Sequence, residues 1–242
     1  MPKDRLLTPK LITFDCANTL IWTDWSPESF AVRCCGIAGV PLPDRASQEY
    51  LRLLAPKMAE FHALNRSGTL VEWREFWVQQ ISDWLDRLGI VGQDPLALHL
   101  VGEREIFETP SHTFKLFDDV VPCLTGLKAT GIPMAVISNW DLSLHKCMEA
   151  HGILVYFDAV WASLVFGAEK PDARFFAHAY NTFHVRPEEC IHVGDLVVDD
   201  YDGARAAGMN AVLIDRGSGE PSRERGTISS LSQLGETFDW FD

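Results

Sequence analysis

Hydrophobic side chains gather in short continuous runs at four places along the chain: residues 11–14, 134–137, 191–193 and 211–214. Runs that are rich in β-branched residues and do not alternate with polar positions predict strands buried on both faces, which is typical of a parallel sheet. Helical patterns lie between the later runs, at residues 120–130, 142–150 and 173–183. Because alternating strands and helices require crossover connections, the pattern predicts a Rossmann-like, doubly wound α/β core.

The segment from 22 to 112 has a different pattern. It shows no convincing strand, and it carries helical stretches at 46–64 and 71–88. Within the second stretch, apolar side chains recur at three- to four-residue spacing, which places them on one face of a helix. We therefore expect an all-helical cap at 22–112, inserted after the first strand. Residues 1–21 and 113–242 are then expected to form the core domain.

Reactive polar residues directly follow three of the predicted strands. Asp15 follows the first, Ser138 and Asn139 follow the second, and Asp195 follows the third after a single glycine. Lys170 stands just before a predicted helix and can supply a cation. Because ligands bind at the carboxyl ends of the strands in open α/β sheets, we expect these side chains to converge on one site.

Composition and charge narrow the class of partner. The 242 residues are 47% hydrophobic, enough for one large domain or a domain with an insertion. Acidic residues number 34 against 21 basic ones, a net charge of −13 that argues against nucleic acid and an anionic membrane surface. The six cysteines form no C-x-x-C pair, and we find no apolar signal segment or membrane span. We expect a soluble, cytoplasmic protein whose partner is a small anionic molecule.

The order of these polar residues resembles the haloacid dehalogenase superfamily over nearly the whole chain. The first motif of that family, D-x-D-x-T after a strand, corresponds to Asp15-Cys16-Ala17-Asn18-Thr19. The second, a strand ending in Ser or Thr, corresponds to Ser138, and the third, a lysine before Pro-Asp, to Lys170. The fourth, Gly-Asp followed by an acid, corresponds to Asp195 with Asp199 and Asp200. The resemblance implies a hydrolase with a helical cap of the family's type-1 arrangement.

The chemistry of these residue types agrees with a phosphatase acting on a small phosphorylated metabolite. A strand-end carboxylate, Asp15, can attack phosphorus and form an aspartyl phosphate that water hydrolyses. Mg²⁺ suits a site of oxygen ligands, and we expect Asp15, Asp195 and a backbone carbonyl to hold it. The remaining assignments follow the motifs: metal ligation or water orientation by Ala17 (carbonyl), Asp199 and Asp200, and phosphoryl-oxygen binding by Thr19, Ser138, Asn139 and Lys170.

One position departs from the family pattern. The residue two after Asp15, an aspartate general acid and base in that family, is Ala17, and a methyl group moves no proton. Loss of such a group typically costs about 10² to 10⁴ in rate. One interpretation is a phosphatase that uses good leaving groups or another acid, for which Cys16, Asp24 and Asp141 are candidates.

Three other interpretations stay open. A C–halogen hydrolase needs no acid, but its branch usually lacks the metal acids that this chain keeps. A phosphonatase-like C–P hydrolase has alanine at this position and uses a cap lysine, for which Lys57 is the only lysine in 22–112. A non-catalytic member would retain the fold for binding.

Tryptophan and histidine positions give further expectations. Helical spacing predicts that Trp73, Trp77 and Trp84 form the cap core, whereas Trp22 and Trp25 are candidates for a lid. Trp140 follows the second motif and is a candidate for the crevice wall. His192 falls inside a predicted strand and is expected to be a hydrogen-bonded core residue.

Overall fold

The computed structural model describes residues 8–67, 69–108, 113–217 and 227–234. Its main sheet has five parallel strands in the order β5-β4-β1-β6-β7, so the first strand lies at the centre. The strands are β1 Leu11–Phe14, β4 Met134–Ser138, β5 Ala159–Ala162, β6 Cys190–Gly194 and β7 Asn210–Leu213. Every residue of β1, β4 and β6 is buried, which is why their sequences are mostly apolar.

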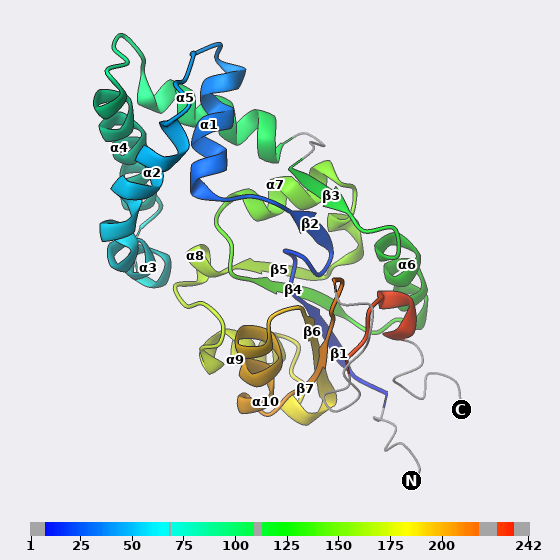
Figure 1. Ribbon diagram of the computed structural model, residues 1–242. Helices are drawn as coiled ribbons and strands as arrows, with labels where there is room; N and C mark the ends of the chain where they lie inside the picture. Colours follow the sequence, from blue (N-terminus) through cyan, green and yellow to red (C-terminus); the bar gives the residue numbers. More distant parts are fainter. Residues whose placement is uncertain (1–7, 68, 109–112, 218–226, 235–242) are drawn as a thin grey trace.

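Helices connect the strands on both sides of the sheet (Figure 1). They are α6 Val120–Thr130, α7 Ser143–Ala150, α8 Ser163–Phe166, α9 Ala173–Thr182 and α10 Gly203–Ala206, with a π-helical turn η5 at Val197–Asp202. Short 3-10 turns are η3 Leu154–Tyr156, η4 Pro187–Glu189 and η7 Leu231–Gln233. The predicted doubly wound α/β core and its four strands are confirmed.

Two features of the strands differ from the sequence prediction. The edge strand β5 was missed because only the small residue Ser163 separates its apolar run from the apolar residues of α8. The prediction of no strand within 22–112 was wrong at its first two residues, because they belong to β2 Ile21–Thr23, which pairs antiparallel with β3 Phe114–Leu116. Three-residue strands are too short to show a periodic pattern. This ribbon carries the chain out of the core and back into it.

The segment between β2 and β3, called the cap below, is helical throughout its described elements. These are α1 Pro27–Ile37, α2 Ala46–Leu54, η1 Ala55–Lys57, α3 Met58–Ser67, α4 Leu70–Leu88, α5 Pro95–Gly102 and the π-helical turn η2 Glu103–Phe107. The expected 46–64 helix is interrupted at η1, which contains Pro56. The predicted 71–88 helix is α4. It begins with a Thr69–Glu72 capping box and ends at Gly89, whose φ is 74°.

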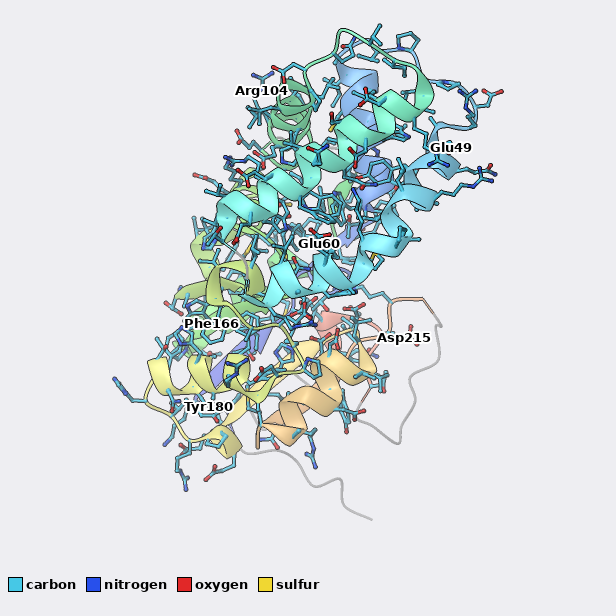
Figure 2. All side chains as sticks on the ribbon, turned by 90° about the vertical axis from the view of Figure 1, so that its left-hand side faces the viewer. Glu49, Glu60, Arg104, Phe166, Tyr180 and Asp215 are labelled. Carbon is cyan, nitrogen blue, oxygen red and sulfur yellow. The ribbon has the colours of Figure 1, made fainter. Side chains whose placement is uncertain are left out.

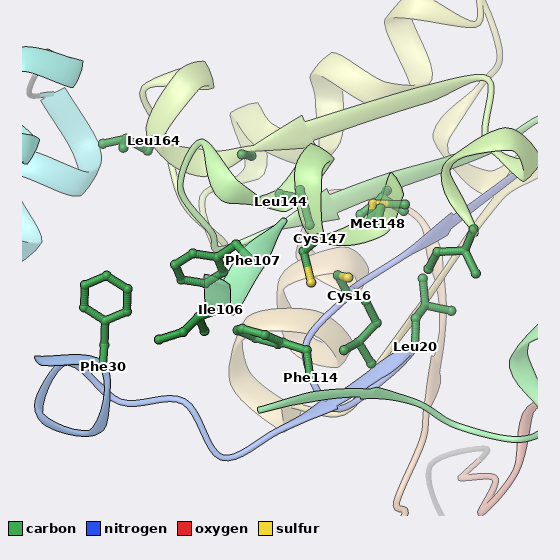
Figure 3. Close-up of a cluster of buried hydrophobic side chains, with 14 of the residues drawn as sticks. Cys16, Leu20, Phe30, Ile106, Phe107, Phe114, Leu144, Cys147, Met148 and Leu164 are labelled. Carbon is green, nitrogen blue, oxygen red and sulfur yellow. The ribbon is translucent and has the colours of Figure 1, made fainter. Parts of the chain in front are cut away.

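The cap stands to one side of the sheet and shares buried side chains with the core (Figures 1 and 2). Figure 3 shows this shared cluster, with Phe30 of α1 at the cap end and Cys16 and Cys147 at the core end. Within the cap, α5 lies so close to α1 that a Cβ on Gly102 would stand 2.1 Å from the Cys34 sulfur. In the described ranges, no helix has the length and apolarity needed to cross a bilayer.

Candidate active site

Asp15 lies where β1 ends, at the centre of the sheet. Its backbone N–H donates to the Val193 carbonyl on the neighbouring strand at 2.9 Å, which fixes the main chain. Its Oδ1 accepts hydrogen bonds from Ser138 Oγ at 2.9 Å and from Lys170 Nζ at 2.5 Å. Residues from three distant parts of the chain therefore meet at one carboxylate, as the strand-end argument predicts.

Lys170 is buried and bridges two carboxylates. Besides Asp15, its Nζ donates to Asp200 Oδ1 at 2.6 Å. Its backbone is held by Asn139, whose Oδ1 accepts from the Lys170 N–H at 2.7 Å and whose Nδ2 donates to the Lys170 carbonyl at 3.0 Å. Asn139, which sequence reasoning assigned to substrate, thus positions the lysine.

Three carboxylates form an acidic cluster: Asp15, Asp195 and Asp200 each offer an oxygen within 4.8 Å of the others. The hydroxyl of Thr19, which the sequence analysis expects to hold a phosphoryl oxygen, donates to Asp195 Oδ1 at 3.4 Å. Asp199 is not part of the cluster. Its neighbour Asp200 enters the cluster because Gly194 has no Cβ, which would stand 2.2 Å from the Asp200 carboxyl carbon.

Charge in this cluster is unbalanced. Burial, together with the charges of Asp15 and Asp200, raises the pKa of Asp195 to about 7. Burial alone would also raise the pKa of Asp200, but the Lys170 ammonium and His192 hold it below its usual range. Burial raises the pKa of Asp15 even though Lys170 opposes the shift. When all three carboxylates are ionised, one ammonium leaves two negative charges, and hard oxygen donors of this kind fit Mg²⁺.

His192 completes the support of Asp200, a role that sequence reasoning missed. The ring is fully buried, with Nε2 3.1 Å from Asp200 Oδ1 and Nδ1 2.9 Å from Thr13 Oγ1. A carboxylate only accepts, so Nε2 carries the proton, and in a neutral ring Nδ1 is an acceptor facing the Thr13 hydroxyl, which also lies 3.3 Å from the Ile191 carbonyl. Burial lowers the pKa of His192, which favours this neutral form. The expectation of a hydrogen-bonded core histidine is confirmed. The sequence contains one indication that its partner belongs to the site: His192 is a polar residue in the strand that leads to Asp195.

A partly open cavity of about 150 Å³ adjoins this site, and Ala17 and Asn139 are part of its wall. The other lining residues are Thr23, Trp25, Phe61, Asn65, Trp73, Trp77, Phe107, Phe114, Trp140, Asp141, Ser163 and Glu169. The space beside Ala17 is therefore surrounded by aromatic rings. They come from the cap, from β3 and from the loop after β4.

The structure separates the three candidate replacement acids. Cys16 is fully buried and lies in the apolar cluster with Cys147 (Figure 3). Asp24 is exposed and pairs with Arg33 at 3.1 Å. Asp141 lines the same cavity as Ala17. Of the three, only Asp141 faces the space in which a substrate would be bound.

The cap lysine and the tryptophans also have defined places. Lys57 pairs with Asp83 at 2.9 Å and is not among the described residues of the cavity wall. Trp73 and Trp77 are buried cap residues, as predicted, and they also line the cavity. Trp84 is fully buried in the cap core, where its Nε1 donates to the Ala46 carbonyl at 2.8 Å.

Of the two lid candidates, Trp25 lines the cavity, whereas Trp22 is 37% exposed and lies under the Lys115 ammonium. Trp140, expected at the crevice, does line the cavity, and its Nε1 donates to Ser143 Oγ at 2.8 Å.

Comparisons with known proteins agree with this geometry. A family model described as haloacid dehalogenase-like hydrolase matches residues 9–208. Human haloacid dehalogenase-like hydrolase domain-containing protein 3 is 32% identical over 208 residues, covering 85% of this chain and 81% of that protein. The phosphoserine phosphatase of Thermus thermophilus is 33% identical over 136 residues, covering 55% of this chain and 54% of that protein. Matches to such relatives thus span between about half and four fifths of their length.

A solved structure shares the fold. The putative HAD-hydrolase YfnB from Bacillus subtilis, bound to magnesium, aligns with a TM-score of 0.66 at 19% identity, covering 93% of this chain and 96% of that one. The family model covers most of the chain, including Asp15, Ser138, Lys170 and Asp195. The chain belongs to the haloacid dehalogenase-like hydrolase family.

Proposed function

We propose that the protein is a Mg²⁺-dependent phosphatase that hydrolyses a small phosphorylated metabolite through Asp15. One observation carries the proposal: Asp15 is held at the end of β1 by Ser138 and Lys170, with Asp195 and Asp200 within 4.8 Å. The phosphoserine phosphatase relative and the magnesium-bound YfnB support the same activity and the same ion.

The side chains divide the work of two displacements at phosphorus. Oδ1 of Asp15 is fixed by two donors, which leaves Oδ2 as the nucleophile. Oδ2 bonds to phosphorus as the phosphorus–oxygen bond to the alcohol breaks, and the departing alkoxide takes a proton from water. Water then attacks the phosphorus of the aspartyl phosphate, which releases phosphate and restores the carboxylate. Ser138 and Lys170 stabilise the charge that develops on the phosphoryl oxygens.

Asp15, Asp195 and the Ala17 carbonyl are the groups that would hold Mg²⁺ in this proposal. The ion supplies positive charge that lets an anionic nucleophile approach an anionic phosphoryl group. Asp200 holds the Lys170 ammonium and is itself held by His192, and it would orient water molecules bound to the ion. Asp199, which lies outside the acidic cluster, is assigned no direct contact with the ion.

Because Ala17 donates no proton, the rate of hydrolysis depends on how easily the alcohol leaves. Without a proton donor at this position, esters with acidic alcohols react fastest because their alkoxides leave unprotonated. The alternatives have less support. The acidic cluster is retained, which a halide-releasing enzyme does not need, and Lys57 is tied to Asp83 rather than placed on the cavity wall.

The proposal is tested with p-nitrophenyl phosphate, whose leaving group needs no acid. We expect hydrolysis that requires Mg²⁺ and stops in EDTA. Asp15→Asn should lower the rate at least about 10³-fold, because an amide is a far weaker nucleophile than a carboxylate. Asp24→Asn is the matched control and should retain the wild-type rate, since Asp24 is exposed and pairs with Arg33 rather than with the site. Hydrolysis that survives in Asp15→Asn would refute the assignment.

We also propose that residues 22–112 act as one cap domain over the site, and that the protein works in the cytoplasm without a nucleic-acid partner. The free state of all six cysteines and the net charge of −13 support this setting. Recovery of the protein with the cytosolic fraction of its host cells, and no shift of a labelled duplex in its presence, are the expected results.

A further inference from the structure

The cavity beside the phosphoryl site has a wall of unusual composition. Half of its lining residues are aromatic, contributed by both the cap and the core. The cavity begins at Ala17 and Asn139, and Ser138, next to Asn139, contacts Asp15. A phosphomonoester bound at Asp15 would therefore extend its alcohol portion between these rings.

The charged side chains among the described lining residues are both acidic: Asp141 and Glu169. Glu169 has a partner, since Arg66 of α3 stands 3.3 Å from its carboxylate. Asp141 accepts from the Ser143 backbone N–H at 2.7 Å, and no cation of the described residues forms an ion pair with it. Burial raises the pKa of Asp141, and hydrogen bonds from Ser143 oppose the shift; the nearby Glu103 adds to it and His99 opposes it.

The cavity continues toward a smaller hollow with the same character. Trp25, Trp73, Trp77 and Asp141 line both spaces, and His99 and Glu103 join them in the second. The His99–Glu103 contact, at 3.2 Å, is internal to this wall.

An organic cation matches this surface better than any anion does. Ammonium groups are attracted to the faces of tryptophan rings, and the attraction grows when the site excludes water. Asp141 is half-buried, and a carboxylate that is partly removed from water without a counter-charge gains from a bound cation. A substrate carboxylate would instead meet acidic residues and ring faces, both of which repel it.

We propose that the substrate is the phosphate ester of an amino alcohol, whose cationic nitrogen lies in the aromatic cavity beside Asp141. The inference rests on the phosphatase function proposed above and adds the chemical class of the alcohol. The aromatic rings exclude water and hold the nitrogen, and Asp141 supplies the opposite charge. The phosphoryl group stays at Asp15.

Three esters of similar size test the class. Phosphoethanolamine carries the ammonium group, phosphoserine adds a carboxylate to it, and glycerol 3-phosphate is uncharged in its alcohol portion. We expect kcat/KM for phosphoethanolamine to exceed that for each of the other two by about tenfold or more, mainly through KM. Equal values for phosphoethanolamine and glycerol 3-phosphate would overturn the proposal.

Substitution of Asp141 tests the residue. Asp141→Asn should reduce the preference for phosphoethanolamine over glycerol 3-phosphate to near unity by raising KM for the cation. Glu169→Gln should reduce it less, because Arg66 already neutralises Glu169. A uniform fall in kcat for both alkyl esters in Asp141→Asn, with the preference unchanged, would show proton donation by Asp141 and overturn its role in cation binding.

A binding measurement separates failure of this proposal from failure of the phosphatase. Choline should quench the tryptophan fluorescence of the wild-type protein, whereas its uncharged isostere 3,3-dimethylbutan-1-ol should do so at about tenfold higher concentration. Hydrolysis of p-nitrophenyl phosphate without selective choline quenching overturns the cation site alone. Selective quenching in a protein that hydrolyses none of the esters overturns the phosphatase and leaves the cation site supported.

Discussion

The strand-end site and the aromatic cavity beside it are built in opposite ways. At the strand ends, Lys170 lies between Asp15 and Asp200, and each of these carboxylates has further hydrogen-bond donors. In the cavity, rings dominate and Asp141 has no cationic partner among the described residues. The first arrangement suits a fixed reaction, since its charges are held before substrate arrives. In the second, the ring faces and the Asp141 carboxylate are left for a ligand to contact, which suits discrimination between substrates.

Of the substitutions considered, Lys170→Met should have the largest effect on stability and activity, because it removes the central cation of the strand-end site. Uncompensated buried carboxylates should lower the free energy of unfolding by about 3–5 kcal/mol. The rate should fall by at least about 10³-fold as phosphoryl-oxygen stabilisation is lost. Chemical denaturation and p-nitrophenyl phosphate hydrolysis measure the two effects.

The matched control is Lys128→Met, which breaks an exposed pair with Asp158 and should cost under about 1 kcal/mol. Mg²⁺ should stabilise the Lys170→Met variant more than the wild type, because the carboxylates of the variant carry more uncompensated negative charge. Equal costs for the two lysines would mean that the buried network contributes no more than a surface pair.

Ala17→Asp should restore a proton donor at the point where the strand-end site meets the cavity. The rate on alkyl phosphates should rise by about 10²-fold, with little change on p-nitrophenyl phosphate, whose alcohol leaves unprotonated. Ala17→Asn, of similar size but without an acidic proton, is the control. A gain that appears equally in both variants would point to a change of shape rather than to proton transfer.

Gly102→Ala tests whether the cap can be disturbed while the strand-end site stays intact. The new methyl group would stand 2.1 Å from the Cys34 sulfur, so α5 must move away from α1. Overpacking of this kind typically costs about 1–3 kcal/mol. We expect lower stability with kcat on p-nitrophenyl phosphate nearly unchanged; Gly126→Ala, where a Cβ meets nothing within 4 Å, is the control. A large loss of kcat would contradict separate roles for the two regions.

Arg66→Ala should have the smallest effect on stability. The Arg66–Glu169 pair is exposed on its arginine side, so its loss should cost under about 1 kcal/mol in thermal unfolding. The freed Glu169 adds negative charge to the cavity wall, and the preference for a cationic ester should rise a few-fold. A falling preference would show that Arg66 itself favours the substrate.

Much of the strand-end site was predictable because it depends on the ends of strands. Asp15, Ser138 and Asp195 each follow a buried run, and in a parallel sheet those ends lie at one edge. The choice between Asp199 and Asp200 was not predictable. Adjacent residues on the helical turn η5 point in different directions, so only one of them can face Lys170.

By itself, the sequence determined the buried strands, the helical character of the cap and the polar residues that meet at the central strand, because hydrophobic periodicity is a local property. Only the tertiary structure decided that His192 supports Asp200, that Asn139 holds Lys170, and that Asp141 lines the cavity beside Ala17. These relations depend on side-chain direction and on the contact between the cap and the core. Residues far apart in the chain set both, so no local pattern records them.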